Sequence, residues 1–140
     1  MRVSAKSQYG LRAMVYLATC RDEVCPLKRI SKKEGISFDY LEKIISRLEK
    51  AGLVKSKKGV RGGYFLARPP EKIRISEIMK VLEGEMVLVK CITGMKKYIC
   101  PLEKKCLARN LWKKIQSSLN TTLKSITLAD LISRKYDKEK

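Results

Sequence analysis

Residues 36–68 read ISFDYLEKIISRLEKAGLVKSKKGVRGGYFLAR and decide the fold of this chain. Their first part predicts a helix, because Ser37 or Asp39 caps a run of apolar residues at helical spacing. Their second part predicts two short strands, 53–57 and 64–67, joined by a basic turn that is rich in glycine, the residue that permits positive φ angles. A helix followed at once by such a hairpin is typical of a winged DNA-binding unit.

The residues before this stretch complete a helix-turn-helix. Residues 8–19 place apolar side chains on one face and predict a first helix. Residues 27–34 predict a short second helix, which Gly35 ends. Two helices joined by a tight glycine-containing turn match a helix-turn-helix, whose second helix enters the DNA major groove. The expected fold is mainly α, a winged helix-turn-helix with a small β-hairpin and a long C-terminal dimerisation helix.

The segment after the hairpin predicts one more helix and then a loop. Residues 75–83 have helical periodicity, with Ser76 as the expected cap and Gly84 as the end. The next residues, 85–106, lack a periodic apolar pattern and are interpreted as a loop that contains three cysteines.

Beyond this loop the sequence predicts a long helix with a single apolar stripe. Its leucine and isoleucine residues recur every four positions: Leu107, Leu111, Ile115, Leu119 and Leu123. The stripe has little of its own domain left to cover, so pairing with the same helix of a second copy would bury it in a homodimer. We therefore divide the chain into a DNA-binding domain at 1–84, a cysteine loop at 85–106, and a dimerisation helix with a C-terminal tail at 107–140.

The composition favours a polyanionic partner. The 140 residues include 32 lysines and arginines against 14 acidic residues, which gives a net charge of +18 without any histidine. Nucleic acid is the first expectation and an anionic membrane surface the second. The basic residues follow the helix-turn-helix and the hairpin rather than one face of a free amphipathic helix, so a membrane role is disfavoured. No secretory signal is recognisable and no apolar run approaches the ~18 residues that span a bilayer, so a cytoplasmic location is expected.

The expected DNA contacts lie at the start of the recognition helix and in the wing: Ser37, Phe38, Tyr40, Glu42, Lys43, Lys58 and Arg61. Tyr40 and Lys43 share one helix face and can reach phosphate or a guanine edge. Glu42 can accept a hydrogen bond from a cytosine amino group or repel phosphate. The wing cations can enter a narrow, electronegative minor groove.

Three cysteines, Cys91, Cys100 and Cys106, indicate a chemical sensor. Thiolates are soft ligands for iron–sulfur clusters, zinc or copper, and neighbouring lysines stabilise the thiolate form. Three interpretations remain open: a cluster, a zinc ion with Glu103 or water as fourth ligand, and a thiol–disulfide switch. Cys20 and Cys25 are interpreted as packing residues that carry no chemistry.

An enzyme is disfavoured by what the sequence lacks. No histidine is present to act as a general base, and no Cys-x-x-Cys motif, phosphate-binding loop or paired acidic site is recognisable.

Several of these segments together resemble one family. Residues 36–68, the motif ISEIMKVLEG at 75–84, the segment CLARNLW at 106–112 and ITLADL at 126–131 are similar to the Rrf2 family of bacterial winged-helix regulators, which has IscR-like, NsrR-like and CymR-like members. The resemblance implies a homodimer that binds a palindromic operator in double-stranded DNA. In the metal-sensing branch it implies that Cys91, Cys100 and Cys106 hold an iron–sulfur cluster, with [2Fe-2S] favoured over [4Fe-4S].

The chain departs from that branch at three places. The gap between the first two cysteines has eight residues where five are commoner, whereas the second gap has the usual five. Arg109 occupies the place of the histidine ligand of IscR-like members, and Gln8 the place of the carboxylate ligand of some NsrR-like members. The fourth ligand is therefore open, and the candidates are Gln8, Arg109, Cys20, Cys25 and Glu103.

The sequence thus predicts a transcriptional regulator whose operator affinity depends on a cluster that senses redox state, nitric oxide or the supply of iron or clusters. The alternative is a regulator of the same fold without a cluster, which acts through a thiol switch or a partner protein, as CymR-like members do.

Overall fold

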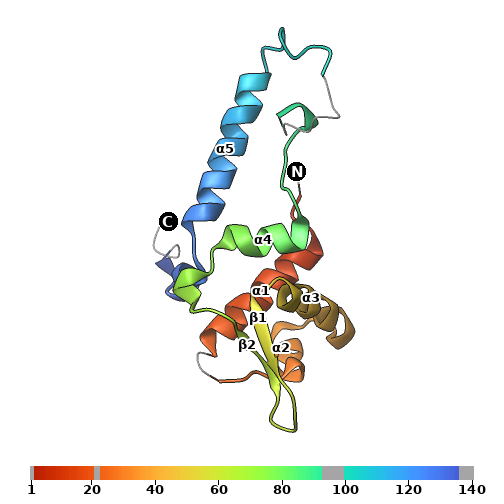
Figure 1. Ribbon diagram of the computed structural model, residues 1–140, viewed down its shortest axis with the longest axis vertical. Coiled ribbons are helices and arrows are strands. Elements are labelled where there is room, and N and C mark those ends of the chain that lie inside the picture. Colours follow the sequence, from red (N-terminus) through yellow and green to blue (C-terminus); the bar gives the residue numbers. More distant parts are fainter. Residues whose placement is uncertain (1, 21–22, 93–99, 136–140) are drawn as a thin grey trace.

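The computed structural model describes residues 2–20, 23–92 and 100–135. A helical body carries the hairpin at one end, and one long helix, α5, stands away from the body at the other end (Figure 1). None of the helices in these described ranges combines the length and the apolarity needed to cross a membrane.

The helix-turn-helix forms as predicted. Its elements are α1 (Ala5–Thr19), α2 (Leu27–Glu34) and α3 (Phe38–Lys50). The chain leaves α2 through Gly35, whose φ of 65° is left-handed and favours glycine. Of the two caps considered for α3, the structure uses Ser37, whose hydroxyl accepts a hydrogen bond from the Tyr40 backbone N–H at 3.3 Å.

The wing is a two-stranded antiparallel hairpin made of β1 (Val54–Lys57) and β2 (Gly63–Leu66). The register pairs Val54 with Leu66 and Lys57 with Gly63. Strand β1 begins one residue later than the predicted 53–57, β2 is shifted by one residue from the predicted 64–67, and the hairpin itself is confirmed. Its turn contains Gly59 at a φ of 116°, a backbone conformation that residues with a side chain rarely adopt.

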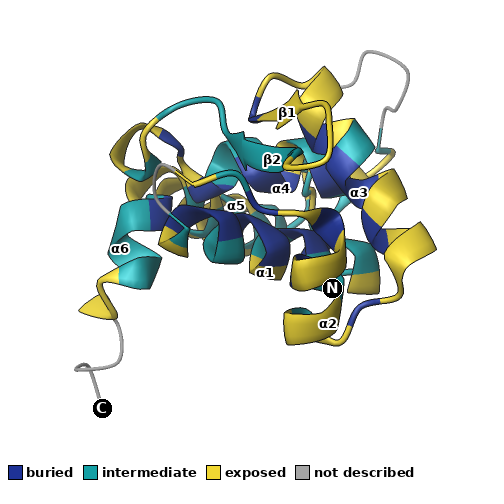
Figure 2. Cartoon of the chain, turned by 90° about the horizontal axis from the view of Figure 1, so that it is seen from below, coloured by how far each residue is buried: buried dark blue, intermediate teal, exposed yellow. Residues whose placement is uncertain are grey.

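The core lies between α1, α3 and α4 (Ile75–Glu83), and Figure 2 shows the buried residues concentrated on these helices. The fully buried large side chains come mainly from them and include Met14, Leu17, Leu41, Ile44, Ile45, Leu48, Ile78 and Leu82. Gly10 lets α1 approach α4, because an added Cβ there would collide with the Leu82 side chain. The recognition helix α3 is therefore held rigidly by its buried face.

The remaining elements are the short turns η1 (Pro70–Lys72) and η2 (Lys90–Ile92), the long helix α5 (Arg109–Ser125) and α6 (Leu128–Ile132). Among its described residues, α5 buries none in this single chain.

The C-terminal segment returns to the body, and this corrects the predicted division of the chain at 107–140. An antiparallel bridge joins Arg74 to Thr127, with the Ile75 N–H donating to the Ile126 carbonyl at 2.9 Å. Leu128 on α6 is fully buried in the same core as α1 and α4. Residues 126–132 therefore belong with the DNA-binding body, because the core is incomplete without them.

The start of α4 differs from the prediction. Arg74, and not Ser76, occupies the cap position, and the Glu77 carboxylate accepts a hydrogen bond from the Arg74 backbone N–H at 2.9 Å. Glu77 also pairs with the Arg68 guanidinium at 2.9 Å. Burial raises the pKa of Glu77, but the hydrogen bonds and charges of Arg74 and Arg68 outweigh it, so the net pKa lies below its usual value.

We expect Glu77→Gln to lower the free energy of unfolding at pH 7 by about 1 kcal/mol, since it weakens the helix cap and removes the ion pair. Because the folded-state pKa lies below the unfolded one, the ionised carboxylate stabilises the fold above its usual pKa, and this contribution is lost as the pH falls. Urea titrations should show a smaller difference in the free energy of unfolding between the native chain and Glu77→Gln near pH 3.5 than at pH 7. Glu71→Gln, at an exposed glutamate in η1, is the matched control. An equal loss at both pH values would contradict the assignment.

Candidate DNA-binding surface and cysteine segment

The exposed start of α3 presents the side chains that the sequence predicted as base contacts. Phe38 and Tyr40 remain 40% and 36% exposed although both are aromatic. Glu42 and Lys43 are also exposed, because the apolar side chains of α3 take up its opposite, buried face. An exposed aromatic pair at the N-terminus of a helix suits apolar contact with a thymine methyl group and hydrogen bonds to base edges.

Sequence reasoning missed a contact that positions Tyr40. Tyr9 on α1 meets the Tyr40 ring edge to face, with centroids 5.8 Å apart. The Arg12 guanidinium lies 5.8 Å from the Tyr9 centroid and pairs with Glu34 of α2 at 3.0 Å. The signal available in the sequence was the spacing of three between Tyr9 and Arg12, which puts them on one face of α1. This contact ties all three helices at the recognition surface.

The wing tip carries the two predicted cations. Lys58 and Arg61 flank an exposed turn, which a hydrogen bond from the Gly62 N–H to the Gly59 carbonyl closes at 2.9 Å. Within the described part of the chain, neither cation takes part in an ion pair. The tip projects from the body in Figure 1, so both charges are available to a phosphate backbone or a minor groove.

The three predicted sensor cysteines are free thiols and partly exposed. Cys91 lies in η2, whereas Cys100 and Cys106 lie at the two ends of a turn that precedes α5. In that turn the Glu103 N–H donates to the Cys100 carbonyl at 3.0 Å and the Cys106 N–H to the Leu102 carbonyl at 2.8 Å.

Three cysteine thiols are suitable ligands for a soft metal, but the structure does not bring them together in one site among its described residues. Over residues 2–20, 23–92 and 100–135, no three Cys, Asp or Glu side chains lie close enough together to hold a metal ion. Residues 93–99, which connect Cys91 to Cys100, lie outside the described ranges. Among these described residues the three thiols are therefore not gathered into one metal site.

The candidate fourth ligands have other partners. Arg109 pairs with Glu103 at 3.0 Å, and the Gln8 side-chain amide donates to the Val3 carbonyl at 3.0 Å. The Arg109 Nε is buried without a hydrogen-bond partner among the described residues.

Cys20 and Cys25 are joined to each other by a disulfide, which differs from the expectation of two inert packing residues. In that state neither sulfur is a thiolate, so neither can serve as the fourth ligand. In Figure 1 this part of the chain lies toward the wing, far from the turn before α5.

Helix α5 connects the cysteine segment to the DNA-binding body. The Gln116 side chain binds the segment that follows α4. It accepts a hydrogen bond from the Leu88 N–H at 2.9 Å and donates one to the Met86 carbonyl at 2.7 Å. At the far end of α5, the Arg74 guanidinium donates to the Lys124 carbonyl at 2.6 Å.

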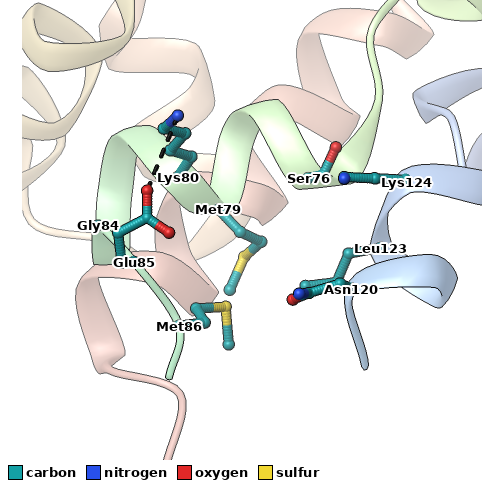
Figure 3. Close-up of a pocket in the computed structure, with 9 residues that line it drawn as sticks. All are labelled: Ser76, Met79, Lys80, Gly84, Glu85, Met86, Asn120, Leu123 and Lys124. Atoms are coloured by element: carbon teal, nitrogen blue, oxygen red, sulfur yellow. Dashed lines mark ion pairs between the residues drawn. The ribbon is translucent and has the colours of Figure 1, made fainter. Parts of the chain in front are cut away.

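Between α4 and α5 lies a pocket of about 230 Å³. Figure 3 shows the side chains of Met79 and Met86 side by side and the Lys80–Glu85 ion pair, whose atoms are 3.8 Å apart, beside them. A movement of α5 would change this pocket and the position of α4 together.

The comparisons with known proteins agree along the whole chain. A family model described as "Rrf2: Iron-dependent Transcriptional regulator" matches residues 3–134. The transcriptional regulator IscR of Yersinia pseudotuberculosis is 34% identical over 134 residues, which are 95% of this chain and 80% of that protein.

Two solved structures are similar in both sequence and fold. The global cysteine regulator CymR of B. subtilis shares 35% identity at a TM-score of 0.82, over 95% of this chain and 97% of the other. IscR of T. potens shares 38% identity at a TM-score of 0.76, over 95% and 87% of the two chains. Both likenesses support the winged-helix fold.

We expect Lys58→Gln together with Arg61→Gln to weaken DNA binding. The dependence of log K on log salt should become shallower by about 1 to 2 units, because the loss of two phosphate contacts lowers the number of counterions released on binding. Fluorescence anisotropy with a labelled duplex over a salt series measures this slope. Lys113→Gln with Lys114→Gln removes the same charge from α5 and is the matched control. A wing variant whose slope equals that of the native chain would move the DNA contact elsewhere.

Proposed function

The chain belongs to the Rrf2 family of transcriptional regulators, and on this premise we propose that it is a cytoplasmic, homodimeric regulator whose affinity for a palindromic DNA operator is controlled through Cys91, Cys100 and Cys106. The observation that carries the proposal is the connection of the cysteine segment, through α5, to the body that positions α3. No catalytic role is proposed.

DNA recognition is assigned to two surfaces of the same body. The exposed N-terminal residues of α3 enter the major groove, and the wing cations reach the adjacent minor groove or phosphates. The net charge of +18 supplies the sequence-independent part of the affinity. Because α3 packs tightly against α1 and α4, the orientation of its exposed side chains toward the DNA bases is fixed.

The dimer is assigned to the apolar stripe of α5. Leu107, just before α5, and Leu111 and Ile115 on α5 are 99%, 53% and 39% exposed, and α5 stands away from the body in Figure 1. A stripe of large apolar side chains in water is unfavourable, and a second copy of the same stripe is self-complementary under two-fold symmetry. Dimerisation would place two recognition helices in a fixed relation to two operator half-sites.

The signal is assigned to the path from the cysteines to α4. The turn that holds Cys100 and Cys106 leads directly into α5, and Gln116 fastens α5 to the segment after α4. A chemical change at the cysteines can alter operator affinity only if it favours one position of this path over another.

For the chemistry at the cysteines we propose an iron–sulfur cluster, [2Fe-2S] before [4Fe-4S]. The three free thiols, the family description as iron-dependent and the 38% identity to an IscR support it. Such a group would supply a centre that reacts with oxidants or nitric oxide. The fourth ligand stays open among Gln8, Arg109, Glu103 and an external donor.

The second candidate is a regulator without a cluster that uses these thiols directly or binds a partner protein. The separation of the three thiols in the structure and the similarity to CymR favour it. The two candidates share the fold and the DNA-binding surfaces and differ only in the chemistry of the signal.

We expect Leu111→Glu to weaken dimerisation by at least about 100-fold, because the apolar burial is lost twice in a symmetric interface. Sedimentation velocity over a concentration series measures this. Ser117→Glu adds the same charge on the opposite face of α5 and should leave the dimer intact. A Leu111→Glu chain that remains dimeric would place the interface elsewhere.

We expect protein purified without oxygen to contain iron and acid-labile sulfide and to absorb visible light, and we expect replacement of Cys91, Cys100 or Cys106 by serine to remove both. Cys20→Ser, which leaves the three thiols untouched, is the control and should keep the colour. If the native protein is colourless and contains no iron, the cluster proposal is wrong, and the second candidate, a regulator without a cluster, is left.

A further inference from the structure

The pocket between α4 and α5 lies between two attachments that hold these elements together. The Gln116 side chain binds the backbone at Met86 and Leu88, and the Arg74 guanidinium donates to the Lys124 carbonyl at 2.6 Å. Between them the chain leaves about 230 Å³ open (Figure 3). This volume is below the ~300 Å³ at which pockets for drug-sized molecules begin, so it suits a small metabolite.

One part of the pocket lining is apolar. It consists of Met79, whose side chain is 6% exposed, and of the partly buried side chains of Met86 and Leu123. Thioether side chains are flexible and polarisable, so they adapt to apolar groups of different shape. This part of the lining therefore suits a short hydrocarbon or thioether chain.

A second part of the lining presents hydrogen-bond donors. The Asn120 side-chain oxygen accepts from the Gln116 amide at 3.0 Å, which leaves the Asn120 NH₂ group to donate. The Ser76 hydroxyl and the Lys124 ammonium line the same opening in Figure 3. In the part of the chain that the structure describes, none of these three donor groups has a hydrogen-bond or ion-pair partner. Three donors without an acceptor suit a ligand group that only accepts, such as a carboxylate.

The charges around the pocket also favour an anion. The ion pair between Lys80 and Glu85 is neutral as a whole. Helix α5 contains no acidic residue from Arg109 to Ser125, so the charge of Lys124 is not compensated on its own helix. A carboxylate would neutralise Lys124 and accept charge-assisted hydrogen bonds, which are stronger than neutral ones.

The pocket and the apolar stripe of α5 lie on different sides of the helix. At 3.6 residues per turn, Asn120 lies about 140° around the helix axis from Ile115, and Lys124 lies about 140° from Leu111. A second copy that covers the stripe therefore leaves the pocket open.

We propose that this pocket is an effector site for a small carboxylate with a short apolar chain, and that its occupancy sets the position of α5 relative to α4. Lys124, Ser76 and Asn120 bind the carboxylate, and the chain lies against Met79 and Met86. The link from this site to DNA affinity rests on the function proposed above, because α4 shares its core with α3 and α5 carries the dimer stripe.

The first experiment needs no DNA and titrates the full chain with hexanoate, norleucine, acetate and hexylamine. The signals followed by NMR are the Met79 and Met86 methyl groups and the Asn120 side-chain amide. Hexanoate or norleucine should shift them with a Kd below about 5 mM, since both combine a carboxylate with an apolar chain. Acetate lacks the chain and hexylamine reverses the charge, so both should bind at least about 10-fold more weakly.

The probes also distinguish two sources of the carboxylate. Tighter binding of hexanoate assigns the site to a simple acid, whereas tighter binding of norleucine assigns it to an amino acid whose ammonium group contacts Glu85. If neither probe binds, or if hexylamine binds as tightly as they do, the proposal is wrong.

The second experiment tests Lys124. Lys124→Gln should weaken binding of the tighter acid at least about 10-fold, and Lys124→Arg should restore most of it, because the cation is kept. Lys114→Gln removes the same charge from α5 at a place that does not line the pocket, and it is the matched control. Lys124 is exposed, so these changes leave the core intact, and the urea midpoint of each chain checks this. Equal affinities for Lys124→Gln and Lys114→Gln would contradict the assignment.

The third experiment measures affinity for a duplex recovered by selection from a random library, with and without the acid. Saturation of the pocket should change the Kd for DNA at least about 3-fold, and DNA should change the Kd for the acid by the same factor. Lys124→Gln should show no such dependence at the same concentration of acid. An unchanged Kd for DNA in the native chain would refute the link to regulation. If no duplex is bound under either condition while the acid still binds, the proposed DNA-binding function fails, whereas the carboxylate site stands.

Discussion

The short pairing between residues 73–75 and 126–128 is the constraint on which the rest of this structure depends. It joins the start of α4 to the end of α5 through backbone hydrogen bonds of 2.9 and 3.0 Å and buries Leu128 in the core. Together with the hydrogen bonds of Gln116 to the segment after α4, it fixes α5, and with it the cysteine segment, to the body that holds the recognition helix. Because of this pairing, a displacement of α5 would also displace α4, which packs in the same core as α1 and the recognition helix α3.

The Cys20–Cys25 disulfide lies against the wing, whereas Cys100 and Cys106 lie just before α5. The segment that holds Cys91, Cys100 and Cys106 leads into α5, so in the proposed dimer its state would bear on the relation between two protomers and hence on half-site geometry. Cys25 is joined to β2 by its backbone bridge to Tyr64, so the disulfide contacts the wing of its own chain.

Most of the DNA-binding unit could be predicted from the sequence because its signals are local. The cap at Ser37, the left-handed Gly35 and the glycine-rich turn each depend on a few neighbouring residues. The return of residues 126–132 could not be predicted, since it depends on pairing across about 50 positions of sequence. The Cys20–Cys25 disulfide was missed for the same kind of reason, as a spacing of five is compatible with many arrangements and the contact with Arg29 depends on where α2 begins.

The ion pair between Glu103 and Arg109 stabilises the turn that holds Cys100 and Cys106. A cation in the first turn of a helix opposes the helix dipole, and the Glu103 carboxylate at 3.0 Å offsets this cost while it closes the turn from Cys100 to Cys106. A change in the position of Cys100 or Cys106 would act on this turn and on that ion pair. Because Arg109 is the first residue of α5, the disturbance reaches the helix directly. The place at which the resemblance to IscR-like members implies a histidine ligand is thus occupied here by a residue that couples the cysteine turn to the helix by charge.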